Sequence, residues 1–204
     1  MSSLALSFEH RFKPATRPGL RPLLLLHGTG GDETDLLPLG ELVSPGAALL
    51  SPRGQVLEGG MPRFFRRLSE GVFDEADVRR RAADLAGFIS EARAAYGIGA
   101  PVALGFSNGA NIAAALLMLH PGVLSGAALL RAMVPLADPP AFRLDGTRVL
   151  ILSGARDPIV PASNAAALAR MLSAGGADLR HDTLPAGHGL TQDDVVRTGV
   201  WFHG

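Results

Sequence analysis

The sequence predicts an α/β fold: a doubly wound, mostly parallel sheet of about six or seven strands with helices on both faces. Short apolar runs alternate along the chain with longer segments of helical character. Several of these runs are apolar at every position, as strands buried on both faces of a parallel sheet are. The 204 residues are most simply one domain, 1–204, because this length is enough to bury a large core.

Six short apolar segments are predicted to form the parallel strands. They are Pro22–His27, Ala47–Ser51, Val102–Phe106, Ser125–Leu130, Arg148–Ser153 and Leu179–Leu184, with Leu4–Lys13 as a candidate antiparallel edge strand. The predicted helices are Glu75–Tyr96, Asn108–Leu119, Ala162–Ala174 and Gln192–Phe202. Asp74 and Ser163 are candidate N-caps, and Gly97 and Gly175 are candidate stop residues.

Charge and composition exclude several classes of partner. The 19 basic and 19 acidic residues balance, so no net field draws the chain to nucleic acid or to an anionic membrane. The chain has no cysteine, which excludes disulfides, a cysteine nucleophile and thiolate metal sites. Met1–Phe12 lacks the pattern of a signal peptide, and no apolar run reaches the roughly 20 residues that span a bilayer. We therefore expect a cytoplasmic protein without stable membrane insertion.

A Gly-x-Ser-x-Gly motif, Gly105–Gly109, lies between a predicted strand and a predicted helix. The sharp turn that joins them forces its central residue into sparsely allowed backbone geometry, and the two glycines relieve the crowding. Ser107 at the apex of the turn is the candidate nucleophile. The alternative is an ordinary serine in a glycine-rich loop, since the chain contains 25 glycines.

A serine nucleophile needs a histidine base, and in sheets of this kind the histidine comes last in the chain. His188 lies in a loop of small residues directly after the last predicted strand, where its imidazole could reach the edge of the sheet. His120, His181 and His203 also follow Ser107, but each has a setting that suggests a structural or solvated role. A solvated loop histidine remains the alternative for His188.

The carboxylate that would orient the histidine is expected at Asp157. This residue follows the predicted strand Arg148–Ser153, and Pro158 and Pro161 stiffen its loop, so the carboxylate is held beyond the end of the strand. The alternative is a structural aspartate that caps the next turn.

Two backbone N–H groups are candidates for an oxyanion hole, which binds the negative oxygen formed during acyl transfer. One belongs to Asn108, directly after the candidate nucleophile, and the other to Thr29, in the glycine-rich loop after the first central strand. The alternative for this loop, a phosphate cradle, is poorly supported because both GxGxxG spacing and a lysine are absent.

Five blocks of sequence carry a family resemblance: Leu25–Glu33, Gly60–Arg67, Gly105–Asn111, Asp157–Pro161 and Gly187–Leu190. In this order they resemble the small carboxylesterase and phospholipase branch of the α/β-hydrolase fold, which includes acyl-protein thioesterases, and within it a bacterial subgroup of the MhqD type. One position departs from the pattern, because Ala132 stands where proline is expected.

The resemblance implies a serine carboxylesterase with Ser107, Asp157 and His188 as its triad and the N–H groups of Thr29 and Asn108 as its oxyanion hole. It implies a small-molecule ester as substrate, no cofactor, no metal and a possible homodimer. A thioesterase or lysophospholipase with the same triad is the alternative. Further alternatives are a lyase, a perhydrolase or a catalytically silent binding protein on this scaffold.

We expect the loops around the triad to determine which substrate is bound. Residues 56–75 form a long connection that is predicted to act as a short lid. Met61, Phe64 and Phe65 in this segment, with Met133 and Leu190 elsewhere, are candidate substrate-binding residues. Three arginines, Arg63, Arg66 and Arg67, could bind an anionic group; a solvated basic face beside core aromatics is the alternative.

Overall fold

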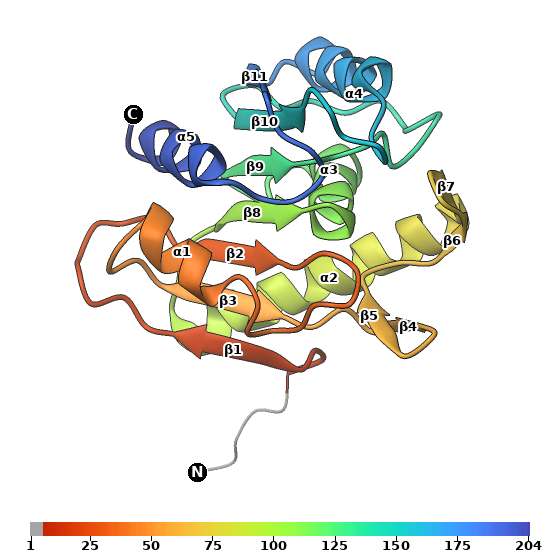
Figure 1. The fold of residues 1–204 in the computed structure, drawn as a ribbon. Helices are drawn as coiled ribbons and strands as arrows, with labels where there is room; N and C mark the ends of the chain where they lie inside the picture. Colours follow the sequence, from red (N-terminus) through yellow and green to blue (C-terminus); the bar gives the residue numbers. More distant parts are fainter. Residues whose placement is uncertain (1–5) are drawn as a thin grey trace.

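A seven-stranded sheet runs through the computed structural model, which describes residues 6–204 (Figure 1). Its strand order is β1-β3-β2-β8-β9-β10-β11. β1 pairs antiparallel with β3 and all other neighbours in the sheet are parallel, which confirms the predicted sheet. The strands are β1 (His10–Lys13), β2 (Leu23–Leu26), β3 (Leu49–Pro52), β8 (Val102–Phe106), β9 (Gly126–Leu130), β10 (Arg148–Gly154) and β11 (Asp178–Leu184).

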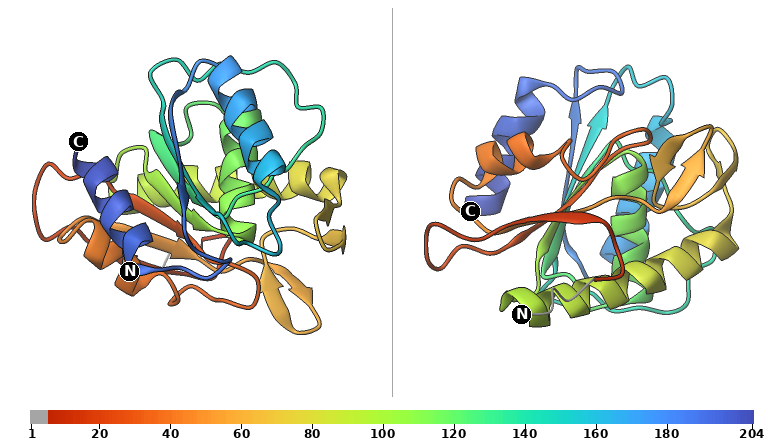
Figure 2. Two further views of the ribbon diagram at one scale, coloured as in Figure 1. Left: turned by 45° about the horizontal axis from the view of Figure 1, so that its top comes forward. Right: turned by 90° about the horizontal axis from the view of Figure 1, so that it is seen from below.

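Helices cover both faces of the sheet. α1 and α5 pack on one face, and α2, α3 and α4 pack on the other (Figure 2). The bounds are α1 (Leu37–Val43), α2 (Glu75–Tyr96), α3 (Asn108–Leu119), α4 (Ala162–Ala174) and α5 (Gln192–His203). All four predicted helices and all six predicted parallel strands are present, with ends that differ by at most two residues. α1 was not predicted, because seven residues are too few for a helical period to be visible.

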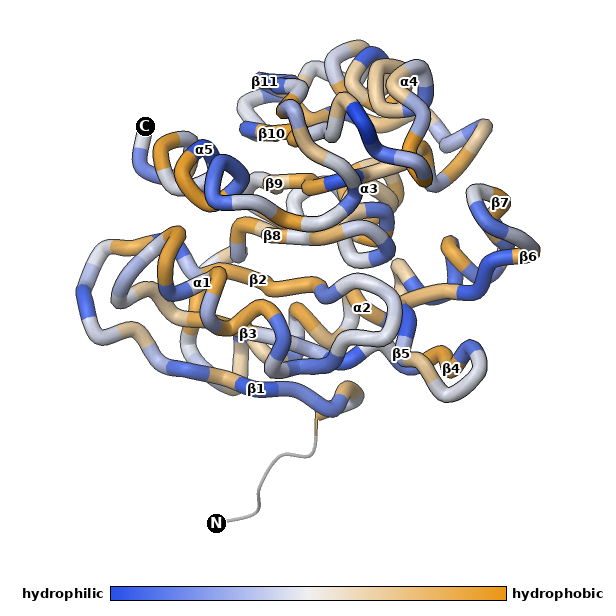
Figure 3. The backbone as a smooth tube through the Cα atoms, in the orientation of Figure 1, coloured by the Kyte–Doolittle hydropathy of each residue, from blue (hydrophilic) through white to orange (hydrophobic). Residues whose placement is uncertain are grey.

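The predicted edge strand is shorter than expected. Leu4 and Ala5 lie outside the described residues, and the strand begins only at His10. Its partner β3 has four residues, and each of the four residues of β1 is paired with one of them, so the ladder ends where β3 ends. β1 is largely hydrophilic in Figure 3, as suits a strand at the edge of a sheet.

Three of the four predicted helix ends are correct. A side-chain oxygen of Asp74 accepts a hydrogen bond from the Asp77 N–H at 3.1 Å, and Gly97 ends α2 in the left-handed conformation with φ 63°. Ser163 lies inside α4, because the helix already starts after Pro161, which is its N-cap residue. Gly175 ends α4 as predicted, but in a right-handed conformation, and the following Gly176 takes the positive φ of 94°.

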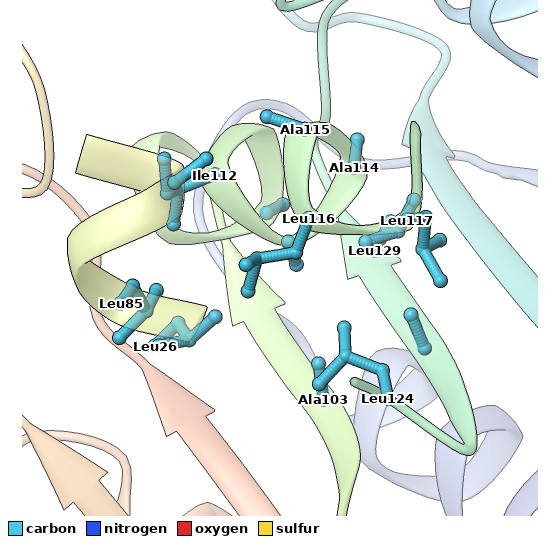
Figure 4. Packing of buried hydrophobic residues seen from close by; sticks show 14 of the residues in the cluster. Leu26, Leu85, Ala103, Ile112, Ala114, Ala115, Leu116, Leu117, Leu124 and Leu129 are labelled. Carbon is cyan, nitrogen blue, oxygen red and sulfur yellow. The ribbon is translucent and has the colours of Figure 1, made fainter. Parts of the chain in front are cut away.

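The side chains of β2 show why its sequence is apolar at every position. Leu24 and Leu26 belong to a buried cluster with α2 and α3 (Figure 4), whereas Leu23 and Leu25 belong to a second cluster beneath α1 and α5. Each of the four leucines is at most 1% exposed. Successive side chains of a strand point to opposite faces, so helices on both sides require an apolar residue at each position.

Two short β-hairpins follow β3. The first pairs β4 (Val56–Glu58) with β5 (Met61–Arg63), and the second pairs β6 (Arg67–Ser69) with β7 (Val72–Phe73). They occupy most of the segment 56–75 that is predicted to form a lid. Among residues 6–204, no helix has both the length and the apolar character needed to cross a membrane.

The close packing of α3 on the sheet depends on glycine. A Cβ atom at Gly109 would overlap the carbonyl oxygen of Leu26, and one at Gly105 would lie 2.6 Å from the carbonyl oxygen of Gly109. Because both obstacles are backbone atoms, a side chain at either position forces the helix away from the sheet.

We expect Gly109→Ala to lower the free energy of unfolding by about 1–3 kcal/mol through this overpacking. Gly87→Ala is the matched control, because Gly87 is an exposed residue of α2 with nothing within 4 Å of an added Cβ. It should raise the free energy of unfolding by about 0.5–1 kcal/mol. Urea denaturation of both variants measures these changes, and equal effects would contradict the packing argument.

Candidate active site

The loops after five parallel strands bring polar side chains to one edge of the sheet. Thr29 follows β2, Ser107 follows β8, Arg131 follows β9, Asp157 follows β10 and His188 follows β11. Carboxyl ends of neighbouring parallel strands meet at the same edge, so residues far apart in sequence can meet there. In Figure 1 the arrowheads of β2, β8 and β9 point toward the side of the molecule that carries the two hairpins.

Ser107 lies in a strained turn between β8 and α3. Its φ of 51° and ψ of −114° are uncommon for a residue with a side chain. Two hydrogen bonds hold the turn: the Ser107 N–H donates to the Leu130 oxygen at 2.9 Å, and the Asn111 N–H donates to the Ser107 oxygen at 2.9 Å. This backbone conformation is the one that the Gly-x-Ser-x-Gly motif predicts.

His188 bridges Ser107 and Asp157. Its Nε2 lies 2.9 Å from Ser107 Oγ, and its Nδ1 lies 2.8 Å from Asp157 Oδ2. A carboxylate can only accept, so Nδ1 carries a proton toward Asp157 and Nε2 is left to accept from the serine hydroxyl. The Asp157 side chain is fully covered, whereas 19% of the His188 side chain is exposed. The structure thus brings together three side chains that the sequence places in separate loops.

Asp157 is held as a carboxylate. Burial opposes its ionisation, but hydrogen bonds from the Ile159 N–H, from His188 and from the Val160 N–H outweigh it and keep the pKa of Asp157 below its ordinary value. The two N–H groups donate to Oδ1 at 2.8 and 3.1 Å, which leaves Oδ2 for the imidazole. Asp157 therefore caps the next turn through Oδ1 while its Oδ2 contacts the imidazole of His188.

A buried ion pair holds the loop that carries His188. Arg131 and Asp194 are fully covered and form two parallel contacts of 2.7 and 2.8 Å. The Arg131 guanidinium also donates to the carbonyl oxygens of Gly187 at 2.9 Å and Gly189 at 3.1 Å, the residues on either side of His188. One rigid group thus holds both flanking carbonyls and fixes the backbone position of His188 at this edge of the sheet.

The backbone N–H groups of Thr29 and Asn108 are free to bind a ligand. Neither donates a hydrogen bond to any protein acceptor within residues 6–204. The strand β5 and the residue after it contact both segments: the Gly30 N–H donates to the Pro62 oxygen at 3.0 Å, and the Phe64 N–H donates to Asn108 Oδ1 at 2.7 Å.

The buried His27 side chain holds the start of the Thr29 loop through two hydrogen bonds. The Gly54 N–H donates to His27 Nε2 at 2.9 Å, so Nδ1 carries the proton and donates to the Gly28 oxygen at 2.6 Å. Burial lowers the pKa of His27, in keeping with a neutral ring. This side chain therefore fixes the start of the loop without adding charge to the site.

A hollow of about 330 Å³ lies beside Ser107 and His188. Both polar and apolar side chains line it: Thr29, Arg63, Arg67, Glu70, Phe73, Phe106, Asn108, Asn111, Arg131, Met133, Ile159 and Val160. A larger groove of about 610 Å³ is lined by Lys13, Glu41, Leu42 and their neighbours, and none of the residues around Ser107 belongs to it. We take the smaller hollow as the substrate site, because it alone contains the reactive side chains.

The predicted substrate-binding residues are only partly in this hollow. Met133 lines it. Phe64 and Phe65 are at most 2% exposed and belong to the hydrophobic core, so this prediction is wrong for them. Leu190 packs against the core cluster beneath α1 and α5, and Met61 is an exposed residue that does not line the hollow. Spacing along the chain did not distinguish core aromatics from pocket aromatics, because both occur beside loops.

Arg131 and Asp194 were missed from the sequence. A signal was present for Arg131, since it is a charged residue directly after the fully apolar strand β9. Asp194 completes a capping box with Thr191 at the start of α5, a pattern that explains a local role but not the pairing with Arg131. Within residues 6–204, no group of three or more histidine or carboxylate side chains is placed to hold a metal ion.

Comparisons with known proteins identify close relatives. No protein-family model matches the chain. "Putative hydrolase MhqD" of Bacillus subtilis (strain 168) is 46% identical over 196 residues, which cover 95% of this chain and 97% of that protein. A crystal structure of the Bacillus cereus carboxylesterase is 43% identical with a TM-score of 0.94, covering 97% of this chain and 94% of the other. The carboxylesterase from Mesorhizobium loti is 35% identical with a TM-score of 0.94, covering 99% and 97%.

We expect Arg131→Met to lower the free energy of unfolding by about 3–5 kcal/mol, because it leaves the Asp194 carboxylate buried without its partner. The double variant Arg131→Met, Asp194→Leu should lose less than the sum of the two single changes, because both charges are removed together. Urea denaturation gives the three values. Strictly additive losses would show that the two side chains do not act as a pair.

Ionised Asp157 should stabilise the fold in a pH-dependent way. Its pKa is lowered on folding, so its contribution is complete above the ordinary value of about 3.9 and is lost as the pH falls through the lower folded value. The difference in unfolding free energy between wild type and Asp157→Asn should be present at about pH 5 and shrink below about 4. Denaturation between pH 7 and 3 measures it, and a difference that persists unchanged in acid would contradict this assignment.

Proposed function

Because the chain belongs to the family of small α/β-hydrolase carboxylesterases that includes MhqD and is an ester hydrolase, we propose that it cleaves small carboxylic esters through an acyl-enzyme on Ser107. In this proposal His188 is the general base and Asp157 orients it. The contacts of 2.9 and 2.8 Å that His188 makes to Ser107 and Asp157 carry the proposal. A nucleophile in contact with a base that a third group orients is the arrangement that activates a serine hydroxyl.

The first half of the reaction forms the acyl-enzyme. Ser107 Oγ attacks the ester carbonyl carbon while its proton moves to His188 Nε2, and Asp157 stabilises the resulting imidazolium. The tetrahedral intermediate collapses with cleavage of the bond to the alcohol oxygen, which takes the proton from His188. The alcohol leaves, and the acyl group remains bound to Ser107.

The second half restores the enzyme. A water molecule attacks the acyl carbon while its proton passes to His188 Nε2, and the bond from the carbon to Ser107 Oγ breaks. The serine oxygen regains its proton from His188, and the carboxylic acid leaves. The same imidazole thus serves as base and then as acid in each half.

The negative oxygen formed in each half is assigned to the N–H groups of Thr29 and Asn108. Neither has an acceptor in the described part of the chain, which supports this role, because donors that are already unpaired need no rearrangement when charge develops. Loss of one such donor typically lowers kcat by about 100- to 1,000-fold.

Removing Ser107 or His188 tests the mechanism. We expect Ser107→Ala and His188→Ala each to lower kcat for a short-chain p-nitrophenyl ester by at least about 10,000-fold, and the double variant to lose no more than either single one. The side chains act as a unit, so their losses do not add. A steady-state assay gives kcat, and labelling with a fluorophosphonate reports whether Ser107 is reactive.

His181→Ala is the matched control. His181 is another half-buried histidine, hydrogen-bonded to Ser153 at 2.8 Å and absent from the hollow. This variant should keep its kcat within about threefold if only the histidine in contact with Ser107 is the base. Full activity of Ser107→Ala would disprove the proposed mechanism.

A further inference from the structure

One arginine lies almost completely buried in the wall of the hollow. Arg63 ends β5, is 2% exposed and lines the hollow together with Ser107 and His188. A guanidinium is costly to bury, so its donors and its charge should be matched by acceptors and carboxylates nearby. For Arg63 this matching is incomplete.

Two of its three nitrogen atoms have protein acceptors. Nε donates to the Phe65 oxygen at 3.2 Å, and Nη1 donates to Thr29 Oγ1 at 2.8 Å. Nη2 has no acceptor among residues 6–204, and it is not one of the fully covered polar atoms that lack a partner. It therefore retains some exposed surface, and Arg63 is a residue of the lining of the hollow.

The charge of Arg63 is also only partly balanced. Its nearest carboxylate, Glu58, lies 3.4 Å away but is held by Arg67 through contacts as short as 2.6 Å. Burial and then repulsion by Arg67 lower the pKa of Arg63 against the attraction of Glu58. Glu70 also lines the hollow, but it is exposed, so water screens its charge. Arg63 and Arg67 therefore share the one carboxylate of Glu58.

We propose that Nη2 of Arg63 binds a carboxylate carried by the ester substrate, close to the bond that is cleaved. Arg63 donates to the side chain of Thr29, and the backbone N–H of Thr29 is assigned to the oxyanion. Nη2 of Arg63 therefore lies near the position proposed for the reacting carbonyl. The hollow of about 330 Å³ is at the small end of ligand sites, which favours a short substrate. This inference rests on the proposed function, because it assumes that the hollow receives the ester.

Two matched pairs of esters test the inference. Monomethyl succinate and methyl 4-methylpentanoate differ only by a carboxylate or an isopropyl group of similar shape on the acyl side. Acetoxyacetate and isobutyl acetate differ in the same way on the alcohol side. The ratio of kcat/KM within each pair is measured by acid release, first for wild type and then for Arg63→Met.

In Arg63→Met, the ratio of anionic to neutral ester should fall by about 10- to 100-fold in at least one pair, as expected for loss of a charge-assisted hydrogen bond. The pair that responds shows which side of the ester carries the carboxylate. The intrinsic reactivity of each ester cancels in the change of ratio. General damage to the oxyanion loop lowers both members of a pair alike and leaves the ratio unchanged.

Two further variants keep the test valid. Arg66→Met is the matched control, because Arg66 is exposed, pairs with Asp74 and does not line the hollow, so both ratios should stay as in wild type. Arg63→Lys keeps the charge but not the forked donors, and should retain part of the preference. It provides the measurement if Arg63→Met does not fold.

The inference is overturned if the ratios in both pairs change by less than about twofold in Arg63→Met and Arg63→Lys. The proposed function fails separately, if Ser107→Ala hydrolyses the four esters at the wild-type rate. Wild type that cleaves all four esters through Ser107 without any response to Arg63 would leave the mechanism intact and remove only the anionic subsite.

Discussion

The buried pair of Arg131 and Asp194 is the interaction on which the site depends most. Arg131 follows β9 and Asp194 lies in the first turn of α5, so the pair joins the centre of the sheet to the last helix. Its guanidinium holds the carbonyls on both sides of His188. This connection adds buried charge-assisted contacts to the backbone bond between Arg156 and Ala186, and it fixes the backbone on both sides of the imidazole.

Strain is concentrated at the same edge of the sheet. Among residues 6–204, Ser107 and Arg131 are the two residues other than glycine with positive φ, at 51° and 57°, and each directly follows a central strand. Both N–H groups donate to the neighbouring strand: Ser107 to the Leu130 oxygen of β9 and Arg131 to the Leu152 oxygen of β10, each at 2.9 Å. The parallel sheet thus supplies the bonds that keep two unfavourable backbone conformations in place.

The sequence predicted the features that follow from local patterns. α2 is correct in both bounds, because Asp74 and Gly97 mark its ends, and the strained turn at Ser107 follows from its two glycines. Features that depend on contacts across the fold were missed or wrong. Phe64 and Phe65 were assigned to the pocket, yet α2 and α3 bury them, and nothing in the sequence relates Arg131 to a partner 63 residues away.

The contacts of β5 have a consequence for how such a protein can evolve. On the hairpin side, the Pro62 carbonyl and the Phe64 N–H hold the Thr29 loop and Asn108, and these are peptide groups that a change of side chain leaves in place. The exposed side chains of Leu57 and Met61 on the same hairpin make neither contact. Mutation of these two residues can therefore alter the exposed surface of the hairpin while both peptide contacts to the site remain, so related chains could diverge on this surface without first losing activity.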